Sequence, residues 1–190
     1  MKGLSSPLLV AIFASILLAQ TPLTESLSSM EGKLQHISTN AVAEPPDQTP
    51  TDISEHEANA WLGSGRVSLP AGVKSVALSG EPDIITGTAL VDFDEVRAGR
   101  SSYNPLLSVF TGDHNVRVVA RAQGAGGEGF VHVEKVTLDD VEIPNFALQM
   151  FVEKYITPKY PNIGIDSRFP LPDRIDTAKV GSHKVTITQK

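Results

Sequence analysis

Apolar and polar residues alternate along much of this chain, and this alternation limits the fold more than any other feature. From Ile85 to Phe93, apolar or small residues occupy every second position, and polar residues occupy the positions between them except at Leu90. The same period of two recurs from Val116 to Ala122. Such alternation is typical of β-strands that cover a core with one face and meet water with the other.

Turn-forming residues separate these runs, so the runs predict hairpins of antiparallel strands. A turn is expected at residues 79–83, and the glycine-rich run from Gly124 to Gly129 leads into a further strand over residues 130–138. The alternation slips at Glu134 and Lys135, which indicates a β-bulge. Later strands are expected at residues 163–169, 174–180 and 184–188.

Two helices are expected beside these strands. Ser54 precedes Glu57 by three residues, which is the spacing of a capping box, and the helix that they open is expected to end at Gly63. A second helix is expected from Pro144 to about residue 156, with an apolar face turned inward. That inward face comprises Ile143, Phe146, Ala147, Met150, Phe151 and Ile156. The predicted fold class is α+β, a curved antiparallel sheet of about six or seven strands packed on two helices.

The first 19 residues have the layout of a secretory signal peptide. Lys2 supplies a positive charge, and the apolar core from Leu8 to Ala19 is shorter than the ~20 residues that span a bilayer. We therefore expect an exported protein, periplasmic or secreted. An uncleaved N-terminal membrane anchor is the minor alternative.

The remaining chain divides by composition into two parts. Residues 20–50 are rich in Ser, Thr and Pro and poor in apolar residues, so we expect a flexible tether there. Residues 51–190 suit a single α+β domain with a core of its own. Because the chain contains no cysteine, this domain must fold by apolar burial without disulfides.

Charge and motifs argue against several functions. The net charge is -6 and no cluster of Lys and Arg stands out, which disfavours nucleic acid as a partner. The five histidines lack the spacing of metal ligands, and the acidic run at residues 92–95 lacks the pattern of a calcium loop. The glycine-rich run at residues 124–129 leads into a strand and not a helix, so it does not predict a phosphate-binding loop. We expect a protein that is not an enzyme and holds no metal or cofactor.

Three segments resemble the LmeA-like phospholipid-binding proteins of bacterial cell envelopes, whose fold is similar to the tubular lipid-binding (TULIP) domains. Residues 53–62 look like the opening helix of that family, and residues 138–144 look like its strand and proline turn before a long helix. Residues 175–187 resemble its final hairpin. The chain is also similar to exported bacterial proteins without an assigned activity.

This resemblance implies a non-enzymatic module that buries an acyl chain between a curved sheet and a helix. The walls of that site would come from one strand and from the second helix, with a phospholipid or another apolar envelope molecule as ligand. The candidate ligand-binding residues are Val91, Phe93, Phe146, Met150 and Phe151.

The sequence is also compatible with two other functions. The same residues could pack as a closed core, and the chain would then be a structural or protein-interaction module that binds an envelope protein through sheet edges or loops. A hydrolase with an unrecognised site is the third and weaker reading. An apolar cavity of ~300 Å³ would favour lipid binding, whereas an exposed apolar patch over a dry core would favour protein interaction.

Overall fold

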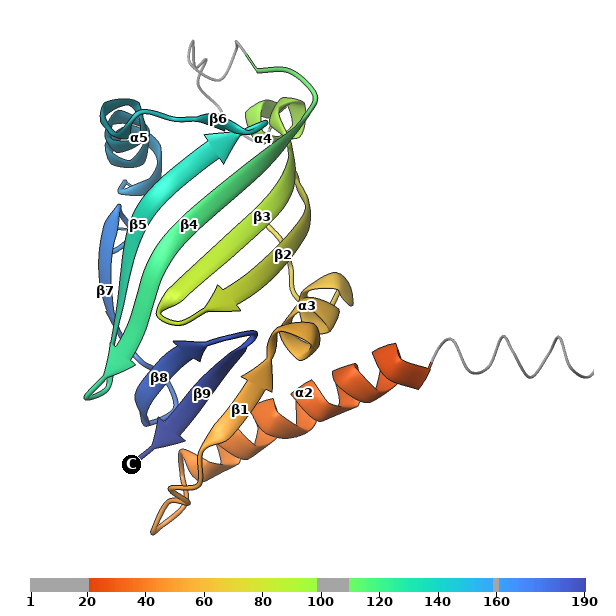
Figure 1. Ribbon diagram of the computed structural model, residues 1–190, viewed down its shortest axis with the longest axis vertical. Helices are drawn as coiled ribbons and strands as arrows, with labels where there is room; N and C mark the ends of the chain where they lie inside the picture. Colours follow the sequence, from red (N-terminus) through yellow and green to blue (C-terminus); the bar gives the residue numbers. More distant parts are fainter. Residues whose placement is uncertain (1–20, 99–109, 159–160) are drawn as a thin grey trace, which may run out of the picture.

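The computed structural model describes residues 21–98, 110–158 and 161–190, and these residues form an α+β fold built on one open antiparallel sheet (Figure 1). The predicted fold class is confirmed at this level, but the sheet has nine strands instead of six or seven. The strands are β1 (Thr51–Ser54), β2 (Val73–Glu81), β3 (Ile84–Asp92), β4 (Asp113–Ala125), β5 (Glu128–Leu138), β6 (Val141–Glu142), β7 (Asp166–Pro170), β8 (Ile175–Gly181) and β9 (Lys184–Gln189). The helices are α2 (Thr21–Asn40), α3 (Glu55–Gly63), α4 (Phe93–Ala98) and α5 (Asn145–Phe151), which continues into a π-helical turn η2 (Val152–Ile156).

The sheet consists of a long meander extended by a second, shorter part. Strands β2, β3, β4 and β5 pair in sequence order, whereas β8, β9 and β1 continue the sheet beyond the end of the β2–β3 hairpin (Figure 1). Strands β6 and β7 both pair with β5. The hairpin predicted in the glycine-rich run is present, since Gly126 and Gly127 have φ angles of 63° and 83° between β4 and β5. Positive φ at both central residues suits the right-handed twist of the flanking strands.

The predicted β-bulge is confirmed on β5. The register of β4 and β5 shifts between Val119 and Ala120, which pair with Lys135 and Val133 respectively. The extra residue, Glu134, interrupts the alternation there. Val133 and Val136 consequently point to the same side of the sheet although they are three residues apart.

Helix α3 begins with the capping box that the sequence predicts. The Ser54 hydroxyl accepts a hydrogen bond from the Glu57 backbone N–H, and the Glu57 carboxylate accepts one from the Ser54 backbone N–H. From α3, Asn59 reaches the outer edge of β2, where its side-chain amide bonds both the N–H and the C=O of Leu78. The side chain thereby occupies backbone groups that a further strand would otherwise pair with.

Residues 21–40 form helix α2, whereas their composition predicted a flexible tether. Helix α2 packs against α3 and β1, and it buries Met30 and Ile37. The apolar residues that make this possible recur at intervals of three and four, which is helical spacing. Because these apolar residues are separated by Ser, Glu, Gly, Lys, Gln and His, the overall composition of the segment hides this pattern. The members of this stripe are Leu27, Met30, Leu34 and Ile37.

The second predicted helix exists, but it turns only part of the expected face inward. Phe146 and Met150 are 71% and 58% exposed, whereas we expected both to face the core. Three other members of the expected face, Ile143, Ala147 and Phe151, are half-buried, and the side chain of Ile156 lies outside the described part of the structure. Leu148 and Val152 complete the half-buried side of α5 and η2. The physical reason is that α5 is apolar on two sides, and packing selects only one of them.

Two further observations concern membranes and the signal sequence. In the part of the chain that the structure describes, no helix is both long and apolar enough to cross a membrane. The predicted signal peptide at residues 1–19, with its alternative as an uncleaved anchor, lies outside the described residues.

Candidate ligand-binding face of the sheet

The meander β2–β5 carries a continuous apolar face. Residues that are paired across antiparallel strands point to the same side, so the register identifies which side chains share this face. Val91 pairs with Val73 on β2, and Val118 on β4 pairs with Gly87 on β3 and Val136 on β5. We call this surface the apolar sheet face; its larger members are Val73, Val76, Leu78, Ile85, Val91, Val116, Val118, Val131, Val133, Val136 and Leu138.

The opposite side of the same strands is polar. It carries threonines on β3 and arginines on β4, and Arg121 forms an ion pair with Glu134 at 2.7 Å. On β5 and β7, His132 Nδ1 lies 2.6 Å from the Asp166 carboxylate. The two sides of the meander therefore differ sharply in hydropathy, as the period-two alternation predicts.

Burial on the apolar sheet face changes along the strands. Ala120, Ala122 and Val136 are buried, but the other apolar residues on this face of β2, β3 and β4 are only half-buried. The part of the face nearest α3 also borders a small apolar hollow of about 60 Å³, lined by Ile53, Leu78 and Val180 among others. The face is therefore best covered where β2 and β3 approach α3, β8 and β9.

An aromatic cluster marks the far end of the apolar sheet face. The rings of Phe93, Phe110 and His114 lie 5.3–5.7 Å apart, and His114 contacts both phenylalanines edge-on. Its Nδ1 lies 2.5 Å from the Asp139 carboxylate. This hydrogen bond, together with a second from the Asn115 backbone N–H, holds the pKa of Asp139 below its ordinary value.

The structure brings together two of the five predicted ligand-binding residues. Val91 lies on the apolar sheet face opposite His114, and Phe93 contacts the His114 ring at the first residue of α4. Phe146 and Met150 instead point outward from α5, so they do not form the predicted wall.

Phe151 is half-buried on the inner side of α5. Figure 1 places α4 and α5 at the same end of the meander, with α4 beside the end of β3 and α5 beyond the β5–β6 turn.

Sequence reasoning missed most of this face. The valines of β5 were recognised as strand residues but not as part of one surface with Val91. The signal that could have found them is the alternation itself, since every second residue of four neighbouring strands is apolar. Phe110 was also missed, because its contact with Phe93 joins segments 17 residues apart.

The described residues do not gather the side chains of a metal site. Within residues 21–98, 110–158 and 161–190, no three His, Asp or Glu side chains come together as a metal site would require. Each histidine whose ring lies close to a carboxylate contacts a single one, as His183 Nδ1 does with Glu55 at 2.8 Å. Comparisons of the chain with protein-family models, curated proteins and solved structures find no match.

Proposed function

We propose that this chain is an exported, non-enzymatic module that binds a lipid or another apolar envelope molecule along the apolar sheet face. One observation carries the proposal: the face is continuous over four strands, and many of its side chains remain only half-buried. A folded protein rarely leaves a contiguous apolar surface open without a binding role. The resemblance to phospholipid-binding envelope proteins points to the same class of ligand.

The energetics favour an elongated apolar ligand over a compact one. A methylene group gains about 0.8 kcal/mol when it leaves water, so about ten methylenes along the strands would gain about 8 kcal/mol before the costs of ordering. The small hollow of about 60 Å³ beside α3 cannot contain such a chain. The ligand would therefore lie along the open part of the face, towards Val91 and the aromatic cluster.

The test is native mass spectrometry of the protein purified from its exported compartment. We expect a co-purifying lipid mass that disappears when the protein is denatured. Val118→Glu should abolish this adduct, because a carboxylate in the middle of the face would have to be desolvated by the ligand.

The matched control is Val119→Glu on the same strand. Val119 points to the polar side, where it pairs with Thr86 and Lys135, so the adduct should persist in this variant. If Val118→Glu does not fold, Val118→Thr keeps the shape of the side chain and should still reduce the adduct.

An adduct that is equally present in the Val118 and Val119 variants would overturn the proposal. A bare mass for the wild-type protein would do the same and would favour a protein partner for this face.

A further inference from the structure

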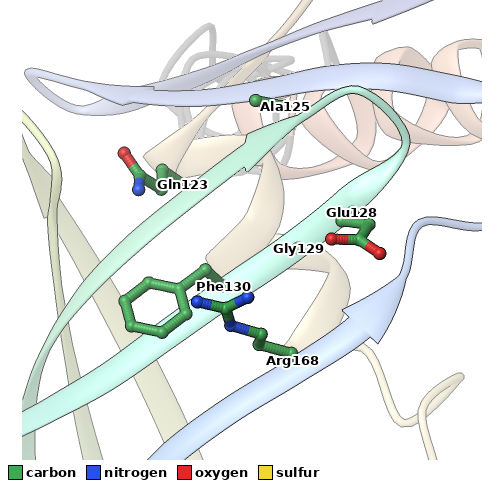
Figure 2. A pocket seen from close by; sticks show the side chains of 6 residues that line it. All are labelled: Gln123, Ala125, Glu128, Gly129, Phe130 and Arg168. Carbon is green, nitrogen blue, oxygen red and sulfur yellow. The ribbon is translucent and has the colours of Figure 1, made fainter.

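The polar side of the sheet holds a second candidate site, which the lipid-binding proposal does not use. A hollow of about 250 Å³ lies between β4, β5 and β7 (Figure 2). Its lining residues are Gln123, Ala125, Glu128, Gly129, Phe130 and Arg168. A neighbouring hollow of about 380 Å³ shares Phe130 and Arg168 with it.

The strand register places a positive and a negative side chain in adjacent cross-strand pairs of this surface. Arg168 on β7 lies opposite Phe130, and Glu128 lies opposite Pro170 in the next row. Arg168 and Glu128 are therefore diagonal neighbours across the strand pair, about 7–8 Å apart at their backbones, which long side chains can span. They nevertheless form no ion pair with each other, and neither side chain has a hydrogen-bonding partner among the described residues.

Phe130 explains why the two charges stay apart. The Arg168 guanidinium carbon lies 5.6 Å from the centre of the Phe130 ring, a cation–π arrangement. Figure 2 shows the guanidinium beside the ring, with Glu128 further along β5 towards the hairpin turn. A guanidinium held in this way keeps its N–H groups available for an oxyanion, which it binds in a bidentate manner.

The other acidic residue near Arg168 is already engaged. The Asp166 carboxylate is bound by His132 Nδ1 at 2.6 Å, and it lines the neighbouring hollow instead. Glu128 is thus the one carboxylate among the six lining residues of the first hollow. Gln123 pairs with Phe130 on the β4 side of the hollow, where its amide can donate or accept a hydrogen bond.

We propose that this hollow binds a small zwitterion, with its oxyanion on Arg168 and its ammonium group on Glu128. Such a group occurs both in free molecules such as phosphoethanolamine and in the headgroup of a phospholipid. The site is on the polar side of the sheet, so the proposal stands independently of lipid binding on the apolar sheet face.

The experiment is a calorimetric titration of the full chain with phosphoethanolamine, with inorganic phosphate as the comparison probe. We expect Arg168→Gln and Glu128→Gln each to weaken phosphoethanolamine binding by about tenfold or more. Arg168→Lys should recover only part of the loss, because an ammonium group cannot form the bidentate contact. Inorganic phosphate should bind the wild type more weakly than phosphoethanolamine, and Glu128→Gln should remove this preference.

The matched control is Arg117→Gln, which makes the same change of charge on the polar side of β4. Arg117 pairs with Thr88 and Thr137, far from the hollow, and its loss should leave binding within about twofold. A short-chain phosphatidylethanolamine, titrated as a monomer, distinguishes the two sources. Tighter binding than phosphoethanolamine that is lost in Arg168→Gln assigns the site to a headgroup, and no gain that depends on Arg168 assigns it to a free zwitterion.

Equal effects of Arg168→Gln and Arg117→Gln would overturn the proposal, as would equal affinity of the wild type for phosphate and phosphoethanolamine. The lipid adduct in native mass spectrometry and this titration are separate readouts, so the loss of one without the other separates the failure of this site from the failure of lipid binding.

Discussion

The two ends of the sheet are built from similar residues but packed in different ways. At one end, which we call the closed end, α2 and α3 lie beside β1, β8 and β9, and Met30, Ile37 and Val180 are 8%, 4% and 4% exposed. At the other, the open end, the apolar residues of β2, β3 and β4 are only half-buried. The closed end therefore supplies much of the hydrophobic stabilisation, and the open end retains apolar surface for binding.

The polar interactions of the two ends also differ in how deeply they are buried. At the closed end, the Asn40 side chain bonds Gln189 at 2.9 Å and the backbone of Asp47, and Gln189 in turn bonds the Ile37 carbonyl. Such satisfied buried networks fix one arrangement of the elements that they join. The open end has mostly exposed pairs, such as Lys135 with Glu142 at 2.7 Å, which contribute little to stability.

The largest expected difference in unfolding free energy between the two ends comes from truncating one methionine at each end. Met30→Ala at the closed end should lower the free energy of unfolding by about 2–5 kcal/mol, because it removes a buried side chain and leaves a cavity. Met150→Ala on α5 should change it by less than about 0.5 kcal/mol, since Met150 is 58% exposed. Urea denaturation followed by circular dichroism measures both, and equal losses would remove the distinction between the two ends.

A smaller difference in unfolding free energy is expected when one ion pair is broken at each end. Glu57 accepts hydrogen bonds from Lys33 and Ser29 on α2 and completes the capping box of α3. Glu57→Gln should therefore cost about 2–3 kcal/mol in unfolding free energy. Glu142→Gln, which breaks the exposed pair with Lys135, should cost less than about 0.5 kcal/mol. A large loss for Glu142→Gln would show that the open end depends on its surface charges.

The Glu57 contribution should also depend on pH. Burial acts to raise the pKa of this carboxyl, but the hydrogen bonds from Lys33, Ser29 and Ser54 outweigh burial and lower the pKa from 4.5 to about 2. Because the folded pKa lies below the unfolded one, the stabilisation is complete above about pH 4.5 and is lost as the pH falls towards about 2. The stability gap between wild type and Glu57→Gln should thus narrow at about pH 3, and a constant gap would contradict this assignment.

A further effect on stability and on self-association is expected at the edge of β2, where α3 meets the meander. Asn59→Ala should lower the unfolding free energy by about 1–2 kcal/mol, because it leaves both backbone groups of Leu78 without their side-chain partner. It should also increase self-association through the exposed edge. Analytical ultracentrifugation of Asn59→Ala beside wild type checks the second effect, and Asn59→Asp, which retains only the acceptor, should be intermediate in stability.

Local patterns predicted the elements whose cause is local. The capping box at Ser54 and Glu57, the hairpin at Gly126 and Gly127, and the bulge near Lys135 all depend on neighbouring residues, and all three are confirmed. The short strand β1 was not predicted because it exists only by pairing with β9, which lies more than 130 residues later.

The candidate site was less predictable because it depends on tertiary packing. Val91 was correctly placed on an apolar strand face, but which side of α5 would face the sheet could not be read from a helix with two apolar sides. Phe146 and Met150 were assigned to the wrong side for that reason. The Arg168–Phe130 pair joins β7 and β5 across the sheet, and no spacing along the chain indicates it.

The pairing of β1 with β9 has a consequence for the order of folding. Asn40 and Gln189 are 149 residues apart, and the closed end needs both. When the chain becomes available to fold from its N-terminus onwards, the meander β2–β5, with its local hairpins, precedes β9. The closed end is therefore the last part of the sheet to assemble, and until β9 arrives the chain holds α2 and α3 without the strands that complete their packing.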